Sequence, residues 1–176
     1  MITYKKVTTT HELFQILELQ EKNLPASISF EEKVIEGFLT VQHDFNLLNL
    51  MNDVCPHIIA KDGEQLVGYA LCMHPKFENK IDLLKPMFRE IKNIIKPFKT
   101  YVVMGQICVN KAYRRQGVFR NLYSKMQELT KTEFDCIITE VDITNRRSLQ
   151  AHYAIGFKIL SKYKSNDRTW ELIFLE

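Results

Sequence analysis

The residues best suited to chemistry lie in the stretch YRRQGVFRNLYSKM, residues 113–126. A single glycine, Gly117, stands there among Arg114, Arg115 and Arg120. A strand-like run precedes the glycine and a helix-like run follows it. The first N–H groups of a helix lack intrahelical partners and carry a partial positive charge, which suits phosphate oxygens. The pattern predicts an anion-binding turn, although the same residues also fit a basic turn that is merely solvated.

Two motif families are missing from this turn. There is no GxxxxGK[ST] loop for nucleotide hydrolysis and no GxGxxG for a dinucleotide. We therefore expect the anion to be bound rather than cleaved. The net charge of +3 is too small and too dispersed to indicate nucleic-acid binding by itself.

A strand, a helix and a second strand must position the turn. The run TYVVMGQICVN, residues 100–110, is rich in β-forming residues, and Gly105 in its middle indicates either a bulge or a place where another group approaches the backbone closely. Phe119, Leu122 and Met126 share one face of an amphipathic helix, and CIITEV at 136–141 is typical of a buried strand. The order is that of a βαβ unit. A short helix at 145–154, stopped by Gly156, follows it.

The remaining elements are predicted from caps, turns and alternation. Thr9 and Glu12 form a capping box for a helix that ends near Pro25, and Ser29 with Glu32 repeats the signal. The other predicted elements are a strand at 2–8, a short helix after Asp44, a hairpin of His57–Lys61 and Gln65–Met73 around Asp62-Gly63, a helix at 82–96, and a closing hairpin around Lys164–Asp167.

Length and composition favour one α/β domain over residues 1–176. The chain has 176 residues, 45% of them hydrophobic, which suffices for one substantial core. No signal-peptide core or apolar run of about 20 residues is present, so we expect a cytoplasmic protein that does not enter membranes. The four cysteines are far apart and are expected to be buried and reduced. The histidines lack metal-ligand spacing, so no metal is expected.

Two segments, Ile107–Met126 and Asn145–Phe157, resemble the GNAT family of N-acetyltransferases. RRQGVF at 114–119 matches the family's [Q/R]-x-x-G-x-[G/A] turn at Arg114 and Gly117 but not at Phe119. NRRSLQAHYAIGF at 145–157 is similar to its N-x-x-[A/S]-x-x-x-Y-x-x-x-G-F segment. The resemblance implies a mixed, mostly antiparallel twisted sheet of about seven strands flanked by helices, with 82–96 as an extra helix between the third and fourth strands.

The resemblance also implies the cosubstrate, acetyl-CoA, and the residues that hold it. Its pantetheine arm would pair with one strand, its pyrophosphate would lie on the N–H groups from Arg115 to Arg120, and two residues of the later helix would flank the arm. The implied binding residues are Ile107, Cys108, Val109, Arg114, Arg115, Gln116, Gly117, Val118, Phe119, Arg120, Asn145 and Ser148.

The implied reaction is direct attack of an amine on the thioester through a tetrahedral intermediate. In the family motif, the tyrosine that faces the sulfur lies seven residues after the asparagine. Counted from Asn145, that position is His152, which is therefore the first candidate for the acid that protonates the leaving thiolate. Tyr153 is the second, and one helical step prevents both from facing the sulfur. Glu140 and Asp142 end a strand near the cleft, but no base is assigned.

Two other functions remain open from the sequence. Phe119 and His152, where the family has a small residue and a tyrosine, also fit a CoA-binding regulatory module without transfer activity. Tyr113 and Phe119 within KAYRRQGVFR could instead stack on nucleic-acid bases. The favoured expectation is a monomeric or homodimeric enzyme with a small-molecule or peptide amine as its acceptor and no nucleic-acid partner.

Overall fold

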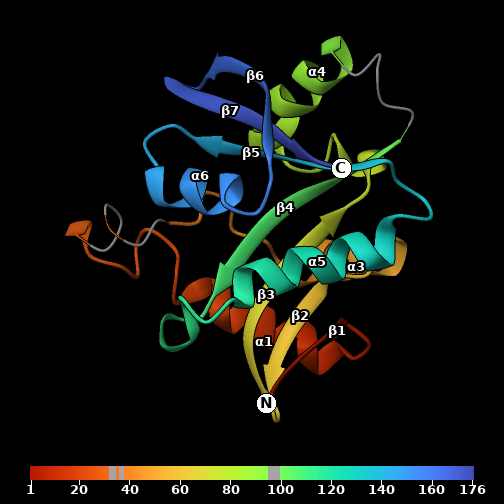
Figure 1. Ribbon diagram of the computed structural model, residues 1–176, viewed down its shortest axis with the longest axis vertical. Helices are drawn as coiled ribbons and strands as arrows, with labels where there is room; N and C mark the ends of the chain where they lie inside the picture. The colour runs from red at the N-terminus through yellow and green to blue at the C-terminus, as the bar shows by residue number, and fades with distance from the viewer. Residues whose placement is uncertain (32–34, 36–37, 95–99) are drawn as a thin grey trace.

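The computed structural model describes residues 1–31, 35, 38–94 and 100–176, and its strands form one seven-stranded sheet (Figure 1). The strand order is β1-β2-β3-β4-β5-β7-β6. All neighbouring strands are antiparallel except β4 and β5. The strands are β1 (Ile2–Lys6), β2 (Ile58–Asp62), β3 (Gln65–Met73), β4 (Tyr101–Val109), β5 (Cys136–Asp142), β6 (Lys158–Ser165) and β7 (Arg168–Leu175).

Helices cover both faces of this sheet. On one face, α5 (Val118–Thr130) buries Leu122 and Met126 against strand residues such as Val102, and α6 (Arg146–Tyr153) lies beside β5. On the other face lie α1 (Thr10–Glu21), α3 (Phe45–Val54) and α4 (Lys85–Ile94), which pack against strand residues of the opposite parity, among them Ile59 and Val103. The described 3-10 turns are Pro75–Phe77, Asp82–Leu84 and Lys111–Tyr113.

The parallel pair β4 and β5 is joined only at one end. Tyr101–Val103 pair with Cys136–Ile138, and beyond this point the strands run apart (Figure 1). The register of β4 against β3 shifts between Met104 and Gln106, which leaves Gly105 as the extra residue of a bulge. The bulge expected at Gly105 is therefore confirmed. Because the bulge turns β4 away from β5, the sheet opens in its centre.

Most of the expected elements are confirmed, with small differences at their ends. Thr9 and Glu12 form the capping box of α1, and Asp44 caps α3 by accepting from the Leu47 N–H. However, α1 ends at Glu21 rather than near Pro25. The helix after Asp82 is present, preceded by a 3-10 turn.

Two expectations need separate comment. Asp62 pairs with Gln65, so the first hairpin turns at Gly63-Glu64, one residue later than predicted, because Gly63 adopts a positive φ of 57°. The second early helix, expected from Ser29 and Glu32, and the end of the 82–96 helix fall largely outside the described residues.

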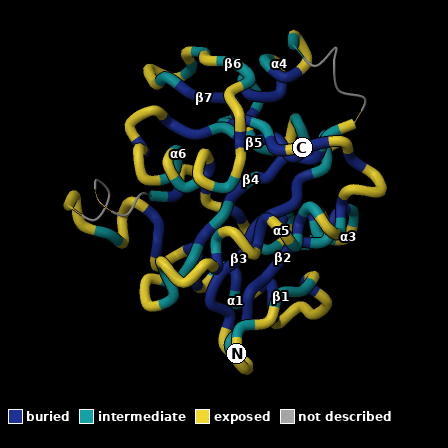
Figure 2. The backbone as a smooth tube through the Cα atoms, in the orientation of Figure 1, coloured by how far each residue is buried: buried dark blue, intermediate teal, exposed yellow. Residues whose placement is uncertain are grey.

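Burial is concentrated in the central strands (Figure 2). Strands β2 to β5 are buried along most of their length, while β6 at the sheet edge is largely open. All four cysteines are buried and free, as the sequence predicts. Among the helices that the structure describes, none has the length and apolar character needed to cross a bilayer.

Candidate active site

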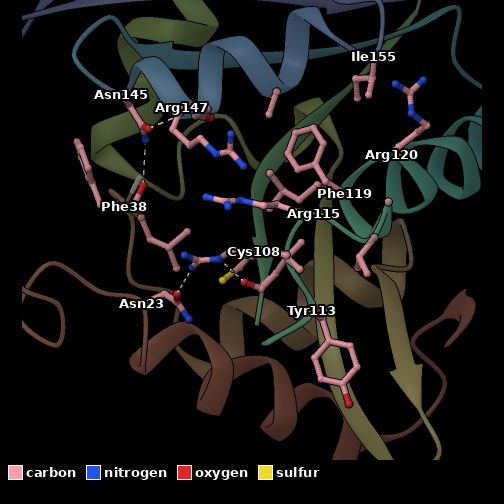
Figure 3. Close-up of a pocket in the computed structure, with 18 residues that line it drawn as sticks. Asn23, Phe38, Cys108, Tyr113, Arg115, Phe119, Arg120, Asn145, Arg147 and Ile155 are labelled. Atoms are coloured by element: carbon pink, nitrogen blue, oxygen red, sulfur yellow. Dashed lines mark hydrogen bonds between the residues drawn. The ribbon is translucent and has the colours of Figure 1, made fainter. Parts of the chain in front are cut away.

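A cavity of about 300 Å³ lies where β4 leaves β5, beside the N-terminus of α5 (Figure 3). We call it the first cavity. Of the cosubstrate residues expected from the sequence, all but Gln116 line it. The expected residues in the lining are Ile107, Cys108, Val109, Arg114, Arg115, Gly117, Val118, Phe119, Arg120, Asn145 and Ser148, and the structure adds Asn23, Phe38, Leu39, Tyr113, Arg147, Ala151 and Ile155.

The N-terminus of α5 opens onto the first cavity. Its N-cap is Gly117, which has a φ of 80° and no side chain to cap the helix. The first regular bond of the helix is donated by Asn121 to the Gly117 carbonyl. The N–H groups of Val118, Phe119 and Arg120 thus precede the helical ladder at the cavity wall. A helix N-terminus in this arrangement attracts an anion through its aligned N–H dipoles.

Four arginines surround this helix end, yet they play different roles. Arg114 is held in place: its Nε donates to the Val109 carbonyl and its guanidinium donates to Asn23 Oδ1 at 3.0 Å. Arg120 donates to the Ala154 carbonyl. Arg115 and Arg147 extend their guanidinium groups into the open space (Figure 3). The cavity lining holds no aspartate or glutamate among the described residues, so its field favours an anion.

Phe119, which departs from the family pattern, packs its ring against the core side of α5. Its ring lies edge to face against Tyr123 and His152, with centroid separations of 5.3 and 5.0 Å. The ring is thus anchored to the core side of α5 while the residue still borders the first cavity. Tyr113 also borders the cavity, but its hydroxyl points away from it and donates to Asp62 (Figure 3).

Cys108 is not a nucleophile in this arrangement. Its side chain is buried at the cavity wall, and burial raises the pKa of the thiol to about 12. The thiol is neutral at physiological pH and acts as part of an apolar surface.

A second, smaller cavity of about 70 Å³ fills the gap between the diverging strands. It shares Phe38, Leu39 and Ile107 with the first cavity, together with Asn145 and Ser148. Most of its remaining walls come from β4 and β5, including Gln106, Thr139, Glu140 and Asp142, and β7 adds Trp170. Two adjoining cavities that share a wall provide room for two reactants that meet at the shared residues.

Glu140 is the carboxyl group in the second cavity best suited to proton transfer. Burial raises its pKa to about 7, although the Tyr163 hydroxyl, which donates to it, opposes the shift. Asp142 is different: it accepts from the Thr144 N–H and hydroxyl, and its other oxygen lies 3.3 Å from Arg168. The sequence placed both acids near the cleft but could not separate them, because burial and partners depend on β6 and β7.

His152 lines the second cavity and is almost fully buried, with 1% of its surface exposed. Nδ1 lies 2.7 Å from the Ser148 carbonyl, which can only accept, so Nδ1 carries the hydrogen. Nε2 therefore accepts from the Tyr123 hydroxyl at 2.8 Å. Burial lowers the pKa of His152 to about 4, and the imidazole is neutral at physiological pH.

The other two expected residues lie outside both cavity linings. Tyr153 is 41% exposed, and its hydroxyl donates to Glu171 on β7. Its position on α6 confirms that it cannot face the same way as His152. The exposed Gln116 side chain donates to the Ala112 carbonyl.

Residues 38–43 form a strap that crosses the site and borders both cavities. Three amide side chains hold its backbone. Asn145 Nδ2 donates to the Phe38 carbonyl, Gln106 Nε2 donates to the Val41 carbonyl at 2.6 Å, and Gln20 bonds both the N–H and the carbonyl of His43. The sequence carries no signal for these bonds, because the partners are far apart along the chain.

Replacing Gln106 by leucine is expected to loosen the strap. Leucine can neither donate to the Val41 carbonyl nor accept from the Tyr69 hydroxyl, which bonds Gln106 Oε1 at 2.6 Å, whereas Tyr69→Phe loses only the second of these bonds. An unpaired buried carbonyl costs about 1–3 kcal/mol, so we expect the KM for the amine to rise about fivefold or more in Gln106→Leu. Steady-state kinetics check this, with Tyr69→Phe as the control that keeps the strap bond. An unchanged amine KM in Gln106→Leu would show that the strap does not contribute to acceptor binding.

Residues 13–157 match the model of the acetyltransferase (GNAT) family. A search of curated proteins found no match.

Solved structures with the same fold include several N-acetyltransferases. The chain superposes on the ribosomal-protein-S18-alanine N-acetyltransferase from Escherichia coli with a TM-score of 0.65 and 14% identity, covering 99% of this chain and 93% of that one. The mosquito arylalkylamine N-acetyltransferase like 5b gives 0.69 and 13%, covering 99% of each. Arabidopsis thaliana Naa50, in complex with a bisubstrate analogue, gives 0.64 and 13%, covering 99% and 98%. At these identities the similarity establishes the fold.

Proposed function

We propose, because this chain belongs to the acetyltransferase (GNAT) family, that it transfers an acetyl group from acetyl-CoA to an amine. The observation that carries the proposal is the pairing of an arginine-rich cavity at the N-terminus of α5 with a second cavity that contains Glu140. One cavity suits the phosphates of the cosubstrate and the other suits an amine that must lose a proton. The amine would attack the thioester directly, through a tetrahedral intermediate, where the two cavities meet.

The charge of the first cavity and the backbone groups in its wall support the assignment of acetyl-CoA to it. The N–H groups after Gly117 and the guanidinium groups of Arg115 and Arg147 would hold the pyrophosphate. Beyond the bulge, Ile107 to Val109 line the cavity along one side and would bind the pantetheine arm by its amides. The cosubstrate supplies the activated acetyl group.

Side chains of this protein would accept the proton of the amine and supply a proton to the leaving thiolate. Ionised Glu140 would accept the proton of the incoming ammonium group, directly or through water. We propose His152 as the acid, since it lines the second cavity whereas Tyr153 does not. Nδ1 would give its hydrogen to the departing thiolate and would regain the one that the attacking nitrogen loses as the C–N bond forms, so that the ring ends neutral, while the Tyr123 hydroxyl keeps its hydrogen and holds Nε2 as an acceptor. Ser148 Oγ, 3.4 Å from Nδ1, borders both cavities and lies on this path.

A CoA-binding module without transfer activity is the second candidate. One observation favours it: protein atoms already bond both ring nitrogens of His152. Measuring release of free CoA thiol from acetyl-CoA, with and without an amine panel, distinguishes the two. Tight CoA binding without amine-dependent thiol release would favour the module.

A glycine pair tests whether the turn binds CoA. Gly117 and Gly63 both have positive φ angles, 80° and 57°, and an added Cβ meets no atom closer than 3.8 Å at either. Alanine at either site should cost about 1–2 kcal/mol of stability through backbone strain. Only Gly117→Ala places its methyl group at the cavity, so we expect about tenfold weaker CoA binding there and none of that loss in Gly63→Ala. Calorimetric titration with CoA measures both.

The contrast between the two variants is the decisive result. Equal CoA affinities in Gly117→Ala and Gly63→Ala, at matched losses of thermal stability, would show that the pyrophosphate does not bind at the α5 turn. The proposed function would then lose its cosubstrate site.

A further inference from the structure

The two cavities of the site have opposite charges in their walls. Arg114, Arg115, Arg120 and Arg147 line the first cavity, whereas Glu140 and Asp142 line the second. Among the described residues of the second cavity, none is a lysine or an arginine. This division sorts the two reactants: the anionic one belongs in the first cavity and a cationic one in the second.

One carboxylate in the wall of the second cavity already has a cation as its partner. Arg168 lies 3.3 Å from Asp142 Oδ2, is half exposed and is absent from the cavity lining. Two other polar groups of the wall are also committed. Gln106 binds Tyr69 and Val41, and the Thr139 hydroxyl donates to the Met104 carbonyl. A carboxylate in this cavity would face Glu140 without a positive partner.

The position of the amine determines which acceptors bring a carboxylate into the second cavity. The nitrogen must reach the residues shared by the two cavities, and in a free α-amino acid the carboxylate is only two bonds from the nitrogen. A nitrogen bound inside the second cavity, whose volume is about 70 Å³, would bring this carboxylate against the same acidic walls. Burying an unpaired carboxylate beside acidic groups is strongly unfavourable.

We propose that the acceptor is a primary amine whose amino-bearing carbon carries no carboxylate. Alkylamines and peptide N-termini share this chemistry, and free α-amino acids do not. The inference rests on the proposed function, since it assigns the second cavity to the amine. Apolar contact with Met104 and Trp170 would accommodate the carbon next to the nitrogen.

Three matched amines test the inference: pentylamine, norleucine and norleucinamide. Pentylamine is norleucine without its carboxylate, and norleucinamide keeps the branch but not the charge. We expect the kcat/KM, expressed per neutral amine, to be on the order of tenfold or more lower for norleucine than for the other two. Pentylamine and norleucinamide compared with each other distinguish a small alkylamine from a peptide-like acceptor. Norleucine used as well as either would overturn the inference.

Equilibrium binding keeps this result separate from that of the proposed function. Titration of each amine into the protein with saturating CoA needs no turnover, and the same order of affinities is expected. If pentylamine or norleucinamide binds better than norleucine but no amine releases CoA thiol from acetyl-CoA, the proposed transfer fails and the inference stands. If neither binds better than norleucine, the inference fails, whether or not transfer occurs.

A charge placed at the cavity mouth provides the converse test. Thr40 is exposed and lines the second cavity, so its replacement should not disturb the core. Thr40→Lys is expected to reduce the preference for pentylamine over norleucine by about threefold or more. Thr40→Val, which has similar size and no charge, should keep the parental ratio. Equal ratios in the lysine and valine variants would contradict the charge argument.

Discussion

Replacing Glu140 by glutamine is expected to lower kcat about 100-fold, the usual effect of removing a general base. Burial raises the pKa of this carboxyl to about 7, so it is protonated in much of the protein below that pH. A protonated carboxyl cannot accept the amine proton. The kcat/KM of the parent should therefore rise as pH increases through about 7, and this inflection should be absent from Glu140→Gln.

Glu171→Gln is the matched control for this prediction. Glu171 lies on β7 next to β5, and a tyrosine hydroxyl, that of Tyr153, also donates to it. It lines neither cavity, and although burial acts in the opposite direction, hydrogen bonds from Lys162 and Tyr153 lower its pKa. The control should keep the parental kcat and the inflection near pH 7. A Glu140→Gln enzyme with more than about a third of the parental kcat would show that Glu140 is not the base.

Local signals explain why so much of the fold could be predicted. The caps at Thr9 and Asp44 depend on residues three positions apart, and their bonds form as the spacing predicts. The bulge at Gly105 and the glycine turn that begins α5 at Gly117 are likewise properties of short segments. The turn of the first hairpin lies one residue later than predicted, because a turn dipeptide does not determine which of its residues ends the strand pairing.

The details of the site that the sequence could not predict depend on contacts between distant residues. Phe38 enters both cavities because Asn145, 107 residues away in sequence, holds its carbonyl. The raised pKa of Glu140 depends on burial under neighbouring strands, and its partner Tyr163 lies on a strand that does not pair with β5. Neither fact has a signal in the local sequence. Spacing indicated His152, whereas its tautomer required the positions of Tyr123 and Ser148.

Replacing His152 by asparagine is expected to lower kcat about 100-fold, with little change in the affinity for CoA. Asparagine retains an N–H donor for the Ser148 carbonyl, so the local bonding of α6 is largely preserved, but it cannot release a proton. The pKa of His152, lowered to about 4 by burial, lies below the assay range, so His152 should add no inflection of its own between pH 5 and 9. Steady-state kinetics and calorimetric titration with CoA separate the two effects, and a kcat within about threefold of the parent would remove His152 as the acid.

Tyr123→Phe decides whether His152 acts through the proposed proton path or only through packing. The Tyr123 hydroxyl donates to Nε2 at 2.8 Å and so keeps the ring hydrogen on Nδ1, the tautomer from which the departing thiolate would take it. We expect Tyr123→Phe to lower kcat about tenfold and the double variant to be no slower than His152→Asn alone, because groups that act as a unit are not additive. Independent packing roles would instead multiply the two losses in the double variant, since Phe119 and Phe157 contact both rings separately.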